Sequence, residues 1–237
     1  MNNRRKILIS GATSGIGLAI SQGLLQRGHQ VVALGRHFDQ LTPAPAGLTT
    51  VEIDLGQLDH LPEKLKQLAR DHGDIDGLIC CAGKGQFGSL EEFSFEQMRQ
   101  LIDLNFTSQA WLSRAFLPAL KQRQRADIIY IGSEAALSGG RRGAIYCASK
   151  FALRGMAQAL REECGRSGVH ICTINPGMVK TPFFDDLAFA PGDDALNYIE
   201  PEDVAEAVML VLESRAGTVV DEINLSPLKR VIKFNKK

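Results

Sequence analysis

Seven short apolar runs, separated by segments with helical spacing, constrain the fold of this chain more than any other feature of its sequence. The runs are nearly continuous in Val, Ile, Leu and Cys, which is typical of strands buried on both faces of a parallel sheet. They cover residues 6–10, 30–34, 50–55, 77–82, 127–132, 169–175 and 219–225. Strands and helices in alternation predict an α/β fold with helices on both faces of a parallel sheet.

The chain has a length suited to one domain of this kind. Its 237 residues can bury most of a single core, and no repeat, low-complexity tract or linker divides them. We therefore expect a single domain over residues 1–237. The least regular segment, at about 181–200, contains Pro182, Pro191 and Gly192 and is predicted to be a mobile loop.

A glycine-rich turn follows the first apolar run. It reads Ser10-Gly11-Ala12-Thr13-Ser14-Gly15-Ile16-Gly17. Glycine lets a backbone turn sharply and approach a ligand closely, and the helix predicted at 18–27 offers unpaired N–H groups and its positive dipole end at the same place. The spacing Gly-x3-Gly-x-Gly differs from the commoner Gly-x-Gly-x2-Gly, but a position between strand and helix is typical of units that bind dinucleotides. We expect this turn to bind a pyrophosphate.

The end of the second apolar run carries an arginine where NAD sites usually have a carboxylate. An Asp or Glu at this point binds the 2′-hydroxyl of the adenosine ribose, whereas this chain has Arg36 and reaches its first acid at Asp39. The planar guanidinium of arginine suits a phosphate group. Arg36 is also compatible with a surface position in a turn. The missing acid favours the first interpretation and predicts NADP(H), with NAD(H) as the less favoured cofactor.

Tyr146 and Lys150 lie four positions apart at the start of a predicted helix, so they share one face of it. A neighbouring ammonium favours the phenolate and lowers the pKa of a tyrosine from its usual value of ~10. A tyrosine tuned in this way exchanges protons with a substrate oxygen. Ser133, at the end of the preceding strand, is placed to donate a hydrogen bond to the same oxygen. The pair alone is also compatible with a surface helix, and the glycine turn favours the catalytic interpretation.

Together these features resemble the short-chain dehydrogenase/reductase family over residues 6–227, nearly the whole chain. The glycine turn matches the family's cofactor loop, and Tyr146 and Lys150 match its Tyr-x3-Lys motif. Ser133 stands thirteen residues before the tyrosine, at the family's usual offset. Asn105 matches the asparagine of the family's catalytic tetrad. The resemblance therefore implies four catalytic residues, Asn105, Ser133, Tyr146 and Lys150.

The same resemblance implies a cofactor site that draws on distant parts of the chain. Members of the family have an acid–apolar pair along the adenine, small residues close to the adenosine ribose, and a segment that holds the nicotinamide. Each of these has a counterpart in this sequence. The implied cofactor-binding residues are Gly11, Thr13, Ser14, Gly15, Ile16, Gly17, Arg36, Asp54, Leu55, Cys81, Ala82, Gly83, Tyr146, Lys150, Pro176, Gly177, Val179 and Thr181. The segment at about 181–200 then corresponds to the family's substrate loop.

The family implies a Rossmann-type, doubly wound parallel sheet of seven strands in the order 3-2-1-4-5-6-7. It also implies hydride transfer between a nicotinamide dinucleotide and a carbonyl/alcohol pair. In that reaction Tyr146 exchanges the proton, Lys150 lowers the pKa of Tyr146 and binds the nicotinamide ribose, Ser133 positions the substrate oxygen, and Asn105 holds a water that links Lys150 to solvent.

The resemblance extends to the branch of the family and to its assembly. The segment at 220–227 lacks the frequent Gly-Gly ending and is similar to NADP-dependent reductases that act on small hydroxy compounds. We therefore expect an NADP-dependent oxidoreductase for a small carbonyl or secondary alcohol, assembled as a homodimer or homotetramer on the helices predicted at 95–123 and 143–166. A dinucleotide-binding regulator without catalytic activity is the alternative.

The sequence departs from the family after the fourth strand. The family's Asn-Asn-Ala-Gly is Cys80-Cys81-Ala82-Gly83 here. The small residues keep the close approach to the adenosine ribose, but the two lost amides usually brace the central sheet with hydrogen bonds. We therefore expect this departure to affect the local rigidity of the sheet rather than the implied hydride transfer.

Charge and cysteine content exclude several other classes. With 27 basic and 27 acidic residues the formal net charge is zero, which disfavours nucleic acid and anionic membranes as partners. The five cysteines lack the spacing of a disulfide framework or of a metal site. No apolar run approaches the length of a signal-peptide core or a membrane span. We expect a cytoplasmic protein with reduced thiols and no metal, whose partner is a small molecule.

Signals about the substrate conflict. Arg141 and Arg142 precede Tyr146 in the loop where substrates of this family enter, and they are either solvated side chains or a site for an anionic substrate. Phe183, Phe184 and Phe189 either form an apolar lid or anchor their loop to the core. The sequence leaves the identity of the substrate open.

Overall fold

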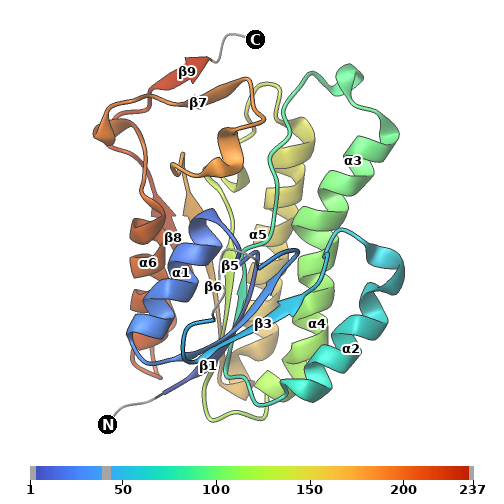
Figure 1. The fold of residues 1–237 in the computed structure, drawn as a ribbon, viewed down its shortest axis with the longest axis vertical. Helices are drawn as coiled ribbons and strands as arrows, with labels where there is room; N and C mark the ends of the chain where they lie inside the picture. The colour runs from blue at the N-terminus through green and yellow to red at the C-terminus, as the bar shows by residue number, and fades with distance from the viewer. Residues whose placement is uncertain (1–3, 39–43, 235–237) are drawn as a thin grey trace.

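Seven strands form one parallel sheet in the computed structural model of the chain, which describes residues 4–38 and 44–234 (Figure 1). The strands are β1 (Lys6–Ser10), β2 (Gln30–Gly35), β3 (Leu48–Glu52), β4 (Gly77–Cys80), β5 (Ala126–Ile131), β6 (Val169–Pro176) and β8 (Glu222–Leu225). Every neighbouring pair is parallel, in the order β3-β2-β1-β4-β5-β6-β8. Because β8 is the seventh strand of this sheet, the predicted order and the doubly wound fold class are confirmed.

Two layers of helices enclose the sheet (Figure 1). One core contains α1 (Gly15–Gln26) and α6 (Pro201–Glu213), and the other contains α2 (Leu61–Asp71), α4 (Ser108–Leu120) and α5 (Ala144–Cys164). Alternation along a strand divides the apolar side chains between the two cores. In β1, Ile7 and Ile9 belong to the first core and Leu8 to the second.

The order of the strands reverses between β1 and β4. β1 pairs with β2 on one side and with β4 on the other, so the first connections wind in one direction and the later ones in the opposite direction. A crevice forms outside the carboxyl ends of the strands at such a switch point, and ligands of doubly wound sheets bind there. The glycine turn follows β1 and Ser133 follows β5, so both lie at this edge of the sheet.

Some strand and helix boundaries differ from those that the sequence predicts. β3 ends at Glu52 rather than at residue 55, because the carboxylate of Asp54 accepts a hydrogen bond of 2.8 Å from the N–H of Gly56 and turns the chain. The helix predicted at 95–123 is interrupted: α3 (Phe95–Ile102) leads into a π-helical turn, Asp103–Thr107, before α4 begins. Such turns insert one extra residue into a helix and are frequent at functional sites.

The segment at 181–200 is more regular than its composition indicates. It contains the short strand β7 (Phe189–Pro191), which pairs antiparallel with β9 (Ile232–Phe234) near the C-terminus (Figure 1). An ion pair of 2.9 Å between Lys233 and Asp193 joins the same two segments. The prediction missed β7 because its partner lies some forty positions further along the chain.

Candidate active site

The glycine turn after β1 is tightly packed at its three glycines. Gly11 and Gly15 have positive φ angles of 70° and 49°, which favour glycine. A Cβ at Gly11 would lie 2.8 Å from the Cα of Ala82, and one at Gly17 would overlap the carbonyl oxygen of Gly11. A side chain at Gly11 would therefore push the turn away from the loop after β4, and one at Gly17 would distort the turn itself.

The N-terminus of α1 is open to a ligand. Its N-cap is Ser14, whose side chain makes no capping hydrogen bond, and no acidic residue stands in the first turn of the helix. The first N–H groups of a helix need a partner, and an anion suits both these donors and the dipole. The predicted residues Thr13, Gly15 and Ile16 surround this end, so the turn fits a pyrophosphate.

The loop that follows β6 lies against the same turn. A Cβ at Gly15 would lie 3.1 Å from the Cβ of Thr181, and Val179 is buried and forms a β-bridge with Ile199. Thr181 therefore lies beside the glycine turn although 166 positions separate them in the sequence. Pro176 ends β6 and Gly177 follows it at the carboxyl edge of the sheet.

The region predicted to bind the adenosine is also assembled at this edge. Gly35 ends β2 against the methyl group of Thr13, and Arg36 is exposed directly after it. Leu55 is buried, and Asp54 is partly exposed with one oxygen bonded to Gly56. Asp39, the first acid after β2, lies outside the described residues.

A buried serine braces the loop that carries Cys81 and Ala82 by hydrogen bonds to the backbone there. The Ser10 hydroxyl accepts hydrogen bonds from the N–H groups of Cys81 (3.0 Å) and Ala82 (3.1 Å) and donates one to the side chain of Gln109 (3.1 Å). It thereby ties β1, the loop after β4 and α4 together. This role was not predicted, because Ser10 belongs to no catalytic motif, although it is the only polar residue of its apolar run that is buried.

We expect Ser10→Ala to lower the free energy of unfolding by about 2–3 kcal/mol, because two buried N–H groups lose their acceptor. Ser21→Ala is the matched control, since the buried Ser21 hydroxyl only donates to the Gly17 carbonyl within α1 and its loss leaves no N–H unpaired. Urea unfolding of both variants measures the difference. Equal, small losses would contradict the brace.

The four candidate catalytic residues come together at the carboxyl ends of β4 and β5. Tyr146 and Lys150 are buried on the first turns of α5, and the Lys150 Nζ lies 5.9 Å from the centre of the Tyr146 ring. The same Nζ donates a hydrogen bond of 3.1 Å to the carbonyl oxygen of Ile131 at the end of β5. Ser133 follows on this strand, and its hydroxyl interacts with that of Tyr146.

Asn105 is fully buried in the π-helical turn between α3 and α4. Its side-chain oxygen accepts from the N–H of Lys84 (2.9 Å), and its Nδ2 donates to the carbonyl of Lys84 (3.0 Å) and to the hydroxyl of Ser149 (3.2 Å). A Cβ at Gly83 would lie 3.1 Å from the Asn105 Oδ1 and 3.7 Å from the Lys150 Nζ. Asn105 thus holds the loop after β4 beside Lys150.

Burial controls the ionisation of the tyrosine and the lysine. It raises the pKa of Tyr146 to about 12, against the opposing effect of the Ser133 hydroxyl, and it lowers the pKa of Lys150 to about 8. The shift of the Tyr146 pKa is therefore opposite in direction to the predicted lowering. Desolvation is the largest cause of both shifts, because a charge on either group is costly in this buried position.

Four phenylalanine rings cluster with the ring of Tyr146. Ring centres are 5.0 Å apart for Phe87 and Tyr146, 5.0 Å for Phe87 and Phe189, and 6.1 Å for Tyr146 and Phe183. Phe184 contacts both Phe183 and Phe189. Phe87, Phe183, Phe184 and Phe189 thus form one cluster in contact with the candidate catalytic tyrosine, and we refer to this cluster as the aromatic lid. Phe87 was missed, since it lies in an irregular loop that carries no motif.

The two arginines before Tyr146 differ in their partners. Arg142 forms an ion pair of 2.8 Å with Glu92 and has a positive φ of 60°. Arg141 is exposed. The binding of an anionic substrate by Arg142 would therefore require it to leave Glu92.

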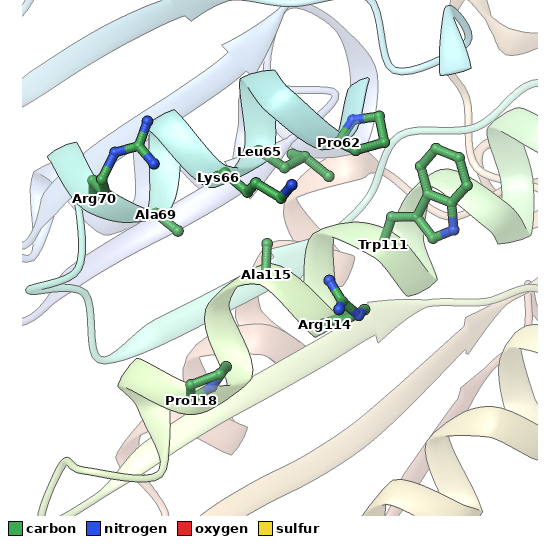
Figure 2. A pocket seen from close by; sticks show the side chains of 9 residues that line it. All are labelled: Pro62, Leu65, Lys66, Ala69, Arg70, Trp111, Arg114, Ala115 and Pro118. Atoms are coloured by element: carbon green, nitrogen blue, oxygen red, sulfur yellow. The ribbon is translucent and has the colours of Figure 1, made fainter. Parts of the chain in front are cut away.

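A separate hollow of about 590 Å³ lies between α2 and α4 (Figure 2). Its lining is Pro62, Leu65, Lys66, Ala69, Arg70, Trp111, Arg114, Ala115 and Pro118. None of the candidate catalytic or cofactor-binding residues is among them, so this hollow is distinct from the candidate active site. Within the described residues there is no group of three or more metal-ligating side chains, and no helix is long and apolar enough to cross a membrane.

The doubly wound sheet, the glycine turn and the buried Tyr146–Lys150 pair define a class of nicotinamide-dependent oxidoreductases. The family model of the short chain dehydrogenases matches residues 5–189. This match covers well over half of the chain, which therefore belongs to the short-chain dehydrogenase/reductase family.

Similar proteins extend over almost the full length of the chain. An uncharacterised oxidoreductase of Staphylococcus epidermidis is 29% identical over 225 residues, which cover 93% of this chain and 96% of the relative. Serine dehydrogenase from Escherichia coli is 28% identical, with a TM-score of 0.79 over 93% of this chain and 96% of that chain. An alcohol dehydrogenase from Thermococcus sibiricus, complexed with 5-hydroxy-NADP, is 26% identical with a TM-score of 0.85 over 97% and 99%.

Proposed function

We propose that the protein is an NADP(H)-dependent oxidoreductase that interconverts a small carbonyl compound and the corresponding secondary alcohol. The observation that carries this proposal is the convergence of the Ser133 and Tyr146 hydroxyls above the buried Lys150, at the edge of the sheet that also carries the glycine turn. Two similar structures hold NADP or a derivative: the Thermococcus alcohol dehydrogenase and a serine dehydrogenase complexed with NADP+, which is 26% identical.

The chain's own residues manage the proton in this proposal. Ser133 and Tyr146 bind the substrate oxygen, and in reduction the Tyr146 hydroxyl donates its proton to that oxygen as negative charge develops there. A pKa of about 12 keeps this hydroxyl protonated at physiological pH, which suits a proton donor. The hydride is supplied or accepted by the bound nicotinamide dinucleotide, because amino-acid side chains lack that chemistry.

Lys150 and Asn105 have supporting roles in this proposal. The Lys150 ammonium is proposed to bind the nicotinamide ribose, which lies within reach because Gly83 leaves the space beside its Nζ open. Asn105 fixes the loop that carries Gly83. Its further role, holding a water between Lys150 and solvent, stays a prediction, as do the single domain over 1–237 and the homodimer or homotetramer.

The helices predicted for the interface between subunits carry the large apolar side chains of Trp111, Phe116, Phe151 and Met156. Phe116 is fully buried within the second core, so it packs on the sheet. Trp111 and Met156 are partly buried against the same core, whereas Phe151 is 43% exposed. Light scattering at micromolar concentration tests the assembly, and a monomer would contradict it.

Turnover with NADPH tests the proposed function directly. A panel of small aldehydes, ketones and hydroxy acids, assayed in both directions with NADP(H) and NAD(H), should contain at least one substrate. The alternative, a regulator that binds the dinucleotide without turnover, predicts tight NADPH binding with no activity on the whole panel. The burial of the Tyr146–Lys150 pair beneath an aromatic lid supports the enzyme.

Arg36→Ala should weaken NADPH binding by about ten- to a hundredfold and leave NADH binding nearly unchanged, because a charged hydrogen bond contributes about 1.5–3 kcal/mol. Fluorescence titration with both cofactors measures the ratio. Arg166→Ala is the control, since Arg166 is exposed just before β6, at the opposite edge of the sheet. An equal loss for both cofactors would make Arg36 structural, and a wild-type preference for NADH would refute the assignment.

A further inference from the structure

Glu134 places a carboxylate at the carboxyl edge of the sheet, directly after Ser133. It begins the 3-10 turn that follows β5, and its side chain reaches across to the end of β6. A Cβ at Gly177 would lie 3.3 Å from the Glu134 Oε2 and 3.5 Å from its Cδ. The carboxylate therefore lies against the turn that Pro176 and Gly177 form, between the two strands that border the candidate active site.

This carboxylate is partly buried and has no partner among the described residues. No N–H, hydroxyl or cationic group in 4–38 and 44–234 forms a hydrogen bond or an ion pair with it. The arginine of the neighbouring loop, Arg142, is paired with Glu92 instead. Partial burial of an ionised group is unfavourable unless a cation, a hydrogen-bond donor or water compensates for the lost hydration. Glu134 is thus available to a ligand that carries such a group.

The aromatic lid favours a cation over other donors. The rings of Phe87 and Phe183 lie 5.0 Å and 6.1 Å from that of Tyr146, and Phe189 closes the cluster. Aromatic faces attract an ammonium group through their quadrupole, and they also cover its alkyl substituents. A carboxylate near the candidate catalytic tyrosine and aromatic rings packed against that tyrosine together suit a small organic cation.

We propose that Glu134 binds a positively charged amino group of the substrate, so that the protein acts on small amino alcohols and the matching amino ketones. This inference rests on the proposed function. Ser133 and Glu134 are consecutive, with Cα atoms ~3.8 Å apart, so the amino group lies within a few bonds of the reacting oxygen. The amino group takes no part in the bond changes, which stay those of carbonyl reduction and alcohol oxidation.

The test compares three alcohols that have the same number of heavy atoms and differ in one substituent. Isopropanolamine carries an ammonium group, propylene glycol a hydroxyl and sec-butyl alcohol a methyl group. Each is oxidised with NADP+ by the wild-type protein and by Glu134→Gln, at a pH below the pKa of the amine. Glutamine keeps the shape of the side chain and an acceptor for a hydroxyl, and it removes only the charge. Glu163→Gln, an exposed carboxylate near the C-terminal end of α5, controls for a general loss of negative charge.

We expect kcat/KM of the wild type to be highest for isopropanolamine. Glu134→Gln should lower that value by about ten- to a hundredfold, mostly through KM, and should change the values for the other two alcohols by no more than a few fold. Glu163→Gln should preserve the ratio between the substrates. Equal losses for all three alcohols, an unchanged ratio, or a wild-type preference for propylene glycol would each overturn the inference.

A binding measurement separates failure of this inference from failure of the proposed function. Calorimetry follows isopropanolamine binding to the protein saturated with NADP+, for the wild type and for Glu134→Gln. If none of the three alcohols is oxidised but isopropanolamine binds in a Glu134-dependent way, the cation site stands and the proposed reaction fails on these substrates. If sec-butyl alcohol is oxidised and isopropanolamine binds equally to both proteins, the reaction stands and the cation site is refuted.

Discussion

Tyr146→Phe is expected to reduce turnover of a confirmed substrate by about 10²–10⁴-fold, the usual contribution of a positioned acid or base. The substitution removes only the hydroxyl, and the ring keeps its contacts with Phe87 and Phe183. Folding and NADPH binding should therefore survive, because neither depends on the proton. Steady-state kinetics gives the loss of kcat, and fluorescence titration shows that the cofactor still binds.

Tyr198→Phe is the matched control for this variant. Tyr198 lies in the substrate loop, where its hydroxyl accepts a hydrogen bond of 3.2 Å from Lys180. Loss of that hydroxyl should change kcat by no more than a few fold. Near-normal turnover by Tyr146→Phe would show that another group transfers the proton.

Because the pKa of Tyr146 is raised, the rate of the reaction should also depend on pH. Oxidation of an alcohol requires the phenolate, and with a pKa of about 12 its population rises about tenfold per pH unit through the neutral range. The rate of oxidation should therefore increase with pH without a plateau near neutrality, whereas reduction, which requires the phenol, should not. Tyr146→Phe should abolish the rise. A plateau below pH ~8 would mean that bound cofactor brings the pKa of the tyrosine far below its usual value of ~10.

Lys150→Met is expected to weaken NADPH binding and at the same time to stabilise the fold. Burial lowers the pKa of Lys150 from 10.5 to about 8, so near neutral pH its ammonium destabilises the folded state by on the order of 3 kcal/mol. Methionine has a similar length and no charge. After the lost hydrogen bond to the Ile131 carbonyl is subtracted, the free energy of unfolding should rise by about 2 kcal/mol. Urea unfolding without cofactor measures this gain.

The stability gained by Lys150→Met should decrease as the pH rises. A lysine whose pKa is lower in the folded state binds fewer protons there than in the unfolded chain, so the wild type becomes more stable as the pH rises from about 8 to 10.5. The advantage of Lys150→Met should shrink over that window. Lys180→Met is the control, because Lys180 is exposed and burial is not the main influence on its pKa. A destabilised Lys150→Met protein would mean that the ammonium is well solvated or paired in the fold.

The loss of cofactor affinity in Lys150→Met should be about ten- to a hundredfold, the contribution of a charged hydrogen bond. A variant that is more stable and binds NADPH less tightly would identify Lys150 as a group kept for function at a cost in stability. Unchanged NADPH affinity would contradict its proposed contact with the cofactor.

The sequence by itself determined the features that depend on local spacing. Apolar runs without polar interruption indicated strands covered on both faces, and the alternation with helices indicated a parallel sheet with helices on both faces. The placement of Gly11, Gly15 and Gly17 predicted the tight turn at α1, and the Tyr146–Lys150 spacing placed both side chains on one face of α5. These features follow from the periodicities of strands and helices, which can be read along the chain.

Only the tertiary structure decided what depends on residues far apart in the chain. Three features join distant segments: the pairing of β7 with β9, the position of Phe87 beside Tyr146, and the hydrogen bonds of Ser10 to the loop after β4. The direction of the pKa shift of Tyr146 also depends on residues far apart in the chain. Spacing put an ammonium near the phenol and predicted a lowered pKa, but burial by the surrounding elements raises it, because desolvation depends on everything that covers a side chain and not on its neighbours in sequence.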